Sequence, residues 1–140
     1  MSREFTSVGV IGLGTMGAGI VEVFARNGID VVAVDADDGG RDRGISAHGV
    51  AALHGRVTYA TDVAALAGCQ LVVEAVPEHL DLKKSILARV DQVVGDDAIL
   101  ATNTSSLSVT EIAVASSNPK RVVGMHFFNP APVQQFVEVV

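Results

Sequence analysis

Tryptophan is absent from this chain, and tyrosine and cysteine each occur once, with the cysteine at Cys69. A single cysteine excludes an internal disulfide. Basic runs are also missing: 10 lysines and arginines stand against 16 acidic residues, which gives a net charge of -6. This balance disfavours DNA or RNA as a partner, because both present a negatively charged backbone. No apolar run approaches the ~20 residues that a membrane-spanning helix needs, so no membrane partner is expected.

The chain begins with MSREFTSVGV, which has neither the apolar core nor the cleavage site of a signal peptide. The cytoplasm is therefore the expected compartment. Hydrophobic residues make up 49% of the 140 residues, which indicates a globular chain with a heavily buried sheet. This length predicts one domain over residues 1–140.

Short runs rich in β-branched residues alternate with segments of helical periodicity along the chain. The expected strands are Ser7 to Ile11, Asp30 to Val34, Val57 to Tyr59, Leu71 to Val76, Ala98 to Thr102, Val122 to Phe127 and Phe136 to Val140. The expected helices are Met16 to Asn27, Asp81 to Val94 and Ser108 to Ala115. One apolar face of the second helix would carry Leu82, Ile86, Leu87, Val90, Val93 and Val94. The alternation predicts a doubly wound α/β fold of the Rossmann type, with a mostly parallel sheet.

Polar side chains gather where these strands end. The first strand runs into GLGTMG, the second into Asp35, the fourth into EAVPEH, the fifth into NTSS, and the sixth into His126 and Asn129. In a doubly wound sheet the carboxyl ends of the strands lie at one edge, where ligands bind. The distribution therefore predicts a single site at that edge.

The glycine motif VIGLGTMGAGI places Gly12, Gly14 and Gly17 at G-x-G-x-x-G spacing between a strand and a helix. The first glycine allows a tight turn, the second lets a pyrophosphate approach the backbone, and the third permits close packing of helix on strand. Asp35 ends the next strand, where its carboxylate would accept hydrogen bonds from an adenosine ribose. A nicotinamide dinucleotide is the expected ligand, with NAD favoured over NADP because Asp35 would repel a 2′-phosphate. The alternatives are a flavin, or glycines that merely punctuate a loop beside a helix-capping aspartate.

His126 and Glu138 end two apolar runs that are separated by the turn signal NPAP. Histidine suits the acceptance of a proton near neutral pH, and a carboxylate behind it fixes the imidazole and stabilises the imidazolium. If the chain folds back at the turn, the two residues form a catalytic pair. The alternatives are a core histidine and a glutamate that faces solvent on an edge strand.

Other candidates have simpler explanations. His48, His54 and His79 are expected to be solvated surface residues, because no cluster of metal ligands accompanies them, and no metal site is predicted. Cys69 is expected to be buried and inert. Lys83 and Lys84 fit the solvated face of a helix, but Lys83 follows Glu78 by about one turn near the predicted site, which favours a functional role for it.

Four stretches together resemble the NAD-binding domain of the 3-hydroxyacyl-CoA dehydrogenases, including the bacterial 3-hydroxybutyryl-CoA dehydrogenases: VGVIGLGTMGAGI, LVVEAVPEHLDLKKSIL, ILATNTSSLSVTEIA and RVVGMHFFNPAPVQQFVEVV. The resemblance covers nearly the whole chain, and NTSSL followed by HFFNP is its most specific part. It implies oxidation of a 3-hydroxyacyl-CoA to a 3-oxoacyl-CoA with NAD, a reaction of fatty acid metabolism. A 3-hydroxyisobutyrate-type dehydrogenase would share GLGTMG but lack HFFNP and use a lysine base.

The resemblance also implies roles for individual residues. His126 would be the catalytic base, Glu138 its partner, and Ser105 a ligand of the substrate oxygen. Glu78, Lys83, Ser105 and Asn129 would surround the nicotinamide half of the cofactor. The full expected set of cofactor-binding residues is Gly12, Leu13, Gly14, Thr15, Met16, Gly17, Asp35, Glu78, Lys83, Asn103, Ser105 and Asn129.

Two departures from that family are expected to matter. Relatives have a long helical hairpin that contacts CoA between the positions of Asp35 and Val57, whereas this sequence has only ADDGGRDRGISAHGVAALHGR there. Relatives also continue into a helical dimerisation domain, which the 140 residues do not include. An alternative function is therefore a nicotinamide-binding module without turnover. Exposure of the surface that such a domain would cover predicts self-association into a homo-oligomer.

Overall fold

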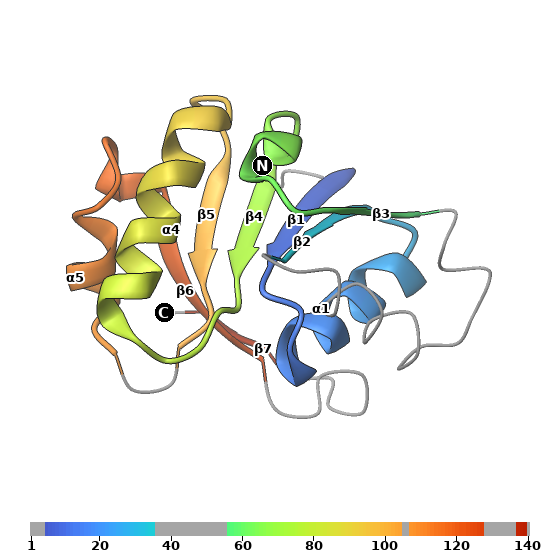
Figure 1. Cartoon of the computed structure of the whole chain (residues 1–140), viewed down its shortest axis with the longest axis horizontal. Coiled ribbons are helices and arrows are strands. Elements are labelled where there is room, and N and C mark those ends of the chain that lie inside the picture. Colours follow the sequence, from blue (N-terminus) through green and yellow to red (C-terminus); the bar gives the residue numbers. More distant parts are fainter. Residues whose placement is uncertain (1–4, 36–55, 105–106, 128–136, 140) are drawn as a thin grey trace.

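The computed structural model describes residues 5–35, 56–104, 107–127 and 137–139. These residues form one seven-stranded sheet in the order β3-β2-β1-β4-β5-β6-β7 (Figure 1). The strands are β1 Ser7–Ile11, β2 Asp30–Val34, β3 Val57–Ala60, β4 Leu71–Glu74, β5 Ile99–Thr102, β6 Val122–Phe127 and β7 Val137–Val139. Strands β1 to β6 pair in parallel and β7 pairs antiparallel with β6. The predicted Rossmann-type α/β fold is confirmed.

Helices cover both faces of the sheet (Figure 1). The helices are α1 Thr15–Arg26, η1 Val63–Leu66, α4 Leu80–Val93, α5 Val109–Ala113 and η2 Pro119–Arg121. Helix α1 packs on one face through a core that includes Ile20, Val21 and the strand residues Val8 and Val10. Helices η1, α4 and α5 pack on the other face, in a second core. Within the described ranges, no helix has the length and apolar character to cross a membrane.

The alternation of side chains along β1 decides how closely each layer approaches the sheet. Val8 and Val10 belong to the core under α1, and Ile11 belongs to the core on the opposite face. Gly9 also faces that second layer, where a Cβ would lie 2.5 Å from Leu66 Cδ2. The missing side chain therefore lets η1 approach the centre of the sheet.

The strand order changes direction beside β1. The chain leaves β1 for β2 and β3 on one side of it, and resumes with β4 on the other side. Such a switch point opens a crevice outside the carboxyl ends of the strands, where doubly wound proteins bind ligands. The sequence prediction of a site at this edge therefore has the required topology.

Helix α4 ends beside an ion pair at the opposite edge of the sheet. Arg121 Nη2 lies 2.6 Å from Asp91 Oδ1, and both side chains are nearly buried. Ser116 Oγ donates to the same Asp91 oxygen at 2.6 Å, and Arg121 Nη1 donates to Gly95 O at 2.7 Å. These contacts hold the carboxyl end of α4 against the segment that enters β6. The ends of both elements that lie away from the site are therefore fixed to each other.

Two predicted boundaries were wrong for local reasons. Strand β4 was expected to continue to Val76 but ends at Glu74, because Val76 N donates to Glu74 Oε2 at 2.8 Å instead of extending the ladder. Helix α5 was expected to run to Ala115 but ends at Ala113, because Ala115 N and Ser116 N donate to Ile112 O and Ala113 O, only three residues earlier. The remaining predicted strands agree with the structure to within one residue at each end.

Candidate active site

The glycine loop joins β1 to α1 and is shaped by two of its three motif glycines. Gly12 has φ of +93°, a conformation that favours glycine, and a Cβ there would lie 2.8 Å from Ala75 C. A Cβ on Gly17 would lie 1.6 Å from Gly12 O. The loop, the start of α1 and the end of β4 are therefore in direct backbone contact, as the motif predicts.

The second motif glycine, Gly14, faces open space. Gly14 is the N-cap of α1, has no side-chain cap, and would place a Cβ with nothing within 4 Å. Backbone N–H groups at a helix start have no intrahelical acceptors and favour negative charge. Leu13 is buried and anchors the loop, while Met16 packs at the edge of the first core. The open position is therefore suited to a pyrophosphate, with Thr15 as the first residue of the helix.

Asp35 directly follows β2 and fixes the glycine loop. Leu13 N donates to Asp35 Oδ2 at 2.7 Å, and Asp35 N donates to Ala60 O at 3.2 Å. The carboxylate is thus held beside the loop from both its side chain and its backbone. Its predicted position at the edge is confirmed, and its contact with an adenosine ribose stays a prediction.

A cleft of about 220 Å³ opens beside Asp35. Its lining residues are Ile11, Gly12, Val34, Asp35, Thr61, Val63, Val76, Pro77, Leu82, Ile86 and Arg89. The walls are mostly aliphatic and the charged groups are Asp35 and Arg89, a combination that suits a flat heterocycle joined to a polar sugar. Leu82, which was predicted to face the core, is 39% exposed and lines this cleft instead.

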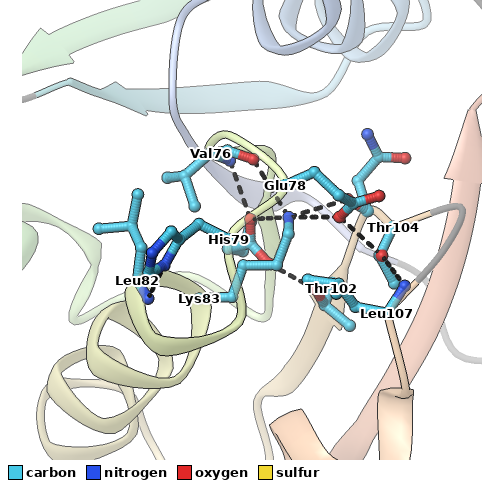
Figure 2. A network of polar contacts seen from close by, with 10 residues as sticks. Val76, Glu78, His79, Leu82, Lys83, Thr102, Thr104 and Leu107 are labelled. Carbon is cyan, nitrogen blue, oxygen red and sulfur yellow. Dashed lines mark hydrogen bonds and ion pairs between the residues drawn. The ribbon is translucent and has the colours of Figure 1, made fainter.

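A buried ion pair lies below the edge between β4 and α4 (Figure 2). Lys83 Nζ is 2.6 Å from Glu74 Oε2, and the exposed fractions of the two side chains are 0% and 2%. Lys83 Nζ also donates to Val76 O at 3.1 Å and to Asn103 O at 3.0 Å. One ammonium therefore joins α4 to the backbone that follows both β4 and β5.

The alternative interpretation of Lys83, as a residue of the solvated face of its helix, is wrong, because its side chain is fully buried. Its burial is possible because each of its three N–H groups has an acceptor in Glu74, Val76 and Asn103. Direct contact of Lys83 with a cofactor stays a prediction. Lys84, its neighbour, is half-buried.

The Glu74 carboxylate accepts hydrogen bonds from an ammonium, a backbone N–H and a hydroxyl. Besides Lys83 Nζ and Val76 N on Oε2, Thr102 Oγ1 donates to Oε1. Burial raises the pKa of Glu74, while the charge of Lys83 and these hydrogen bonds oppose that rise. The carboxylate thus joins β4, β5 and α4 in one buried network.

A second carboxylate lies above this network, at the exposed edge (Figure 2). Glu78 Oε1 accepts a hydrogen bond from Thr104 Oγ1 at 2.7 Å and lies 3.7 Å from Lys83 Nζ. Thr104 Oγ1 in turn accepts from Leu107 N at 3.0 Å. The two loops that were predicted to surround the nicotinamide are thus tied to each other by side chains.

The catalytic pair expected from the sequence is brought together by the last two strands. In the antiparallel register of β6 and β7, His126 pairs directly with Glu138. The parallel register of β5 and β6 pairs Thr102 with Gly124, so His126 follows at the carboxyl edge. The chain therefore folds back as the NPAP turn predicted. Ser105 and Asn129 lie outside the described residues, as do His48 and His54.

His79 is exposed as predicted, and it has a structural role that the sequence did not indicate. It is the N-cap of α4, where its Nδ1 accepts a hydrogen bond from Leu82 N at 3.2 Å. Cys69 is buried, as predicted, and burial raises the pKa of its thiol.

The model of the 3-hydroxyacyl-CoA dehydrogenase NAD-binding domain matches residues 7–140. The chain belongs to this family. It is 44% identical to the 3-hydroxyadipyl-CoA dehydrogenase of Escherichia coli K12 over 158 aligned positions, which cover 100% of this chain and 33% of that protein. It is 41% identical to a 3-hydroxybutyryl-CoA dehydrogenase of Mycobacterium tuberculosis H37Rv, with 100% of this chain and 55% of the relative covered.

Solved structures agree with this assignment. A 3-hydroxybutyryl-CoA dehydrogenase from Escherichia coli K12 superposes with a TM-score of 0.90 at 40% identity, over 98% of this chain and 32% of the other. The chain thus spans between about a third and about half of the length of these relatives. The 158 aligned positions exceed the 140 residues of the chain, so the Escherichia coli relative has residues that this chain lacks.

Family membership confirms NAD as the cofactor of this domain. Glu74, Thr102 and Thr104 were not predicted from the sequence: Glu74 and Thr102 belong to the buried network below the edge, and Thr104 holds Glu78 at the edge. The sequence signal that could have identified Glu74 is its position at the end of the apolar run LVVE, where a buried charge needs a partner.

Proposed function

We propose that this chain provides the cofactor-binding and proton-transfer part of an NAD-dependent 3-hydroxyacyl-CoA dehydrogenase of fatty acid metabolism. The observation that carries the proposal is the register that pairs His126 with Glu138 at the sheet edge that also holds the glycine loop. The names of the relatives support acyl-CoA thioesters as the substrate class.

The proposed cofactor arrangement follows the geometry of the edge. The adenosine half would occupy the aliphatic cleft with its ribose on Asp35, and the pyrophosphate would lie over Gly14 at the start of α1. The nicotinamide half would then reach the loops after β4 and β5, where Glu78 and Asn103 lie. This order places the reactive end of the cofactor towards β6.

The proposed chemistry is an alcohol oxidation in which hydride and proton leave separately. Bound NAD supplies the acceptor for the hydride from C3 of the substrate. His126 accepts the hydroxyl proton, so that the C–O bond becomes a carbonyl, and Glu138 orients the imidazole and stabilises its protonated form. Ser105 would donate a hydrogen bond to the substrate oxygen, and Asn129 would contact the cofactor.

A second candidate function is NAD binding without turnover, which the short sequence between Asp35 and Val57 favours. The experiment is NADH formation from 3-hydroxybutyryl-CoA, run beside a calorimetric titration with NAD. We expect binding and turnover, with little preference for the CoA ester over a small 3-hydroxyacyl thioester, because the sequence between Asp35 and Val57 is short. Binding without turnover would support the second function, and a strong CoA preference would show that another surface recognises CoA.

Asp35→Ala should reduce the preference of the chain for NAD over NADP. The unchanged protein should bind NAD about tenfold or more tightly than NADP, since like charges 4 Å apart near a protein surface repel by roughly 4 kcal/mol before screening by salt. Titration with both cofactors measures the ratio. Asp30→Ala is the matched control, because it removes a carboxylate from the other end of the same strand. Equal affinities in the unchanged protein would contradict this prediction.

A further inference from the structure

Lys83 lies between two carboxylates that differ in exposure. Its Nζ is 2.6 Å from Glu74, which is 2% exposed, and 3.7 Å from Glu78, which is 36% exposed. Its hydrogen bonds go to Glu74, Val76 O and Asn103 O. Glu78 is therefore at ion-pair distance from the ammonium without being its hydrogen-bond acceptor.

The position of the Glu78 side chain at the surface is instead set by a hydrogen bond from another loop. Thr104 Oγ1 donates to Glu78 Oε1 at 2.7 Å, and Thr104 itself is fixed by Leu107 N. This hydrogen bond spans the loops after β4 and β5, above the buried pair (Figure 2). The same Glu78 oxygen thus accepts from the Thr104 hydroxyl beside it and lies within 3.7 Å of the Lys83 ammonium below it.

We propose that Glu74 is a positioning residue that acts on the cofactor through Glu78. The Glu74 carboxylate compensates the charge of Lys83, so that Glu78 remains hydrogen-bonded to Thr104 at the exposed edge. There Glu78 can accept hydrogen bonds from the ribose of the nicotinamide half. The proposal rests on the proposed contact of Glu78 with that half of NAD. It does not depend on turnover of an acyl-CoA.

The physical argument concerns what happens when Glu74 loses its charge. A buried ammonium without a counter-charge is strongly unfavourable, so it attracts the nearest remaining carboxylate. Among the described residues that pair with Lys83, that carboxylate is Glu78. Drawn towards the ammonium, Glu78 would leave Thr104 and the cofactor.

Glu74→Gln tests this with little change of shape. The amide oxygen can take the place of Oε2 and accept from Val76 N and Lys83 Nζ, while the amide nitrogen can donate to Thr102 Oγ1. The substitution therefore removes the charge and leaves each hydrogen bond a partner. Thr102→Val is the matched control, because it removes a hydrogen bond from the same carboxylate without changing any charge.

The experiment is a double-mutant cycle on NAD affinity, measured by calorimetry well below the melting temperature of each protein. We expect Glu74→Gln and Glu78→Gln each to weaken NAD binding by about tenfold, the size of one charged hydrogen bond. The double variant should be no weaker than either single variant, because both changes remove the same contact. Thr102→Val should lower the melting temperature and leave NAD affinity within about twofold.

Losses that multiply in the double variant would overturn the proposal, because a purely structural role of Glu74 would act independently of Glu78. An unchanged affinity in Glu78→Gln would overturn it as well, without bearing on NADH formation from 3-hydroxybutyryl-CoA. If Glu74→Gln does not fold, Thr104→Val replaces it in the cycle. Its loss of NAD affinity should then disappear when Glu78 is already glutamine, and a loss that persists would contradict the proposed positioning.

Discussion

Gly17→Ala should abolish measurable NAD binding and lower the melting temperature by on the order of 10 °C. The added Cβ would lie 1.6 Å from Gly12 O and 2.7 Å from Gly12 C, both backbone atoms. Neither atom can move aside as a side chain would, so the start of α1 must separate from the loop. Overpacking of this kind costs about 3 kcal/mol or more. A thermal melt and a calorimetric titration with NAD measure the two effects.

Gly14→Ala is the informative comparison, because a Cβ at Gly14 would meet no atom within 4 Å. The fold should be retained, with a loss of at most about 1 kcal/mol because alanine is a poorer N-cap than glycine. NAD binding should still weaken, since the methyl group would occupy the approach of the pyrophosphate. Gly68→Ala, which also meets no atom within 4 Å, should leave both properties unchanged. If Gly14→Ala binds NAD normally, the pyrophosphate does not lie over this loop.

These glycines show why much of the fold was predictable from the sequence. The motif, the β-branched runs and the helical periodicity each reflect local requirements of the backbone, and the central strands β1 and β2 have the predicted bounds. The turn signal NPAP likewise predicted that the last two runs would pair, which the register of β6 and β7 confirms. Features of this kind depend on neighbours in the sequence.

The residues that were misplaced depend on partners distant in the sequence. Periodicity placed Leu82 in the core and left Lys83 exposed, whereas the buried residues of α4 are Lys83, Leu87 and Val90. Leu87 and Val90 are buried as predicted, so the difference lies in the first turn, where Lys83 is buried because its ammonium has an acceptor in Glu74. Apolar patterning cannot predict the burial of Lys83, because that burial depends on Glu74, a strand residue nine positions earlier.

His126→Gln should lower the rate of 3-hydroxybutyryl-CoA oxidation by about 10²- to 10⁴-fold, the usual contribution of a general base. Glutamine cannot accept the hydroxyl proton as the hydride leaves, and the rest of the proposed cofactor site is unchanged. NAD affinity should therefore barely change. Initial rates of NADH formation at saturating substrate, together with a calorimetric titration with NAD, measure the two quantities separately.

Glu138→Gln should act through the same proton transfer, because the two positions pair in the register of β6 and β7. Loss of the anionic neighbour destabilises the imidazolium, so turnover should fall and the acidic limb of the rate–pH profile should move to lower pH. The double variant should be hardly slower than His126→Gln alone, since groups that serve one step lose their effect together. Two outcomes would contradict this prediction: losses of rate that multiply in the double variant, or an unchanged rate and pH profile in Glu138→Gln. Either would mean that Glu138 is only a residue of an edge strand, without a part in the proton transfer. His126 would then have to work without an anionic partner at that position.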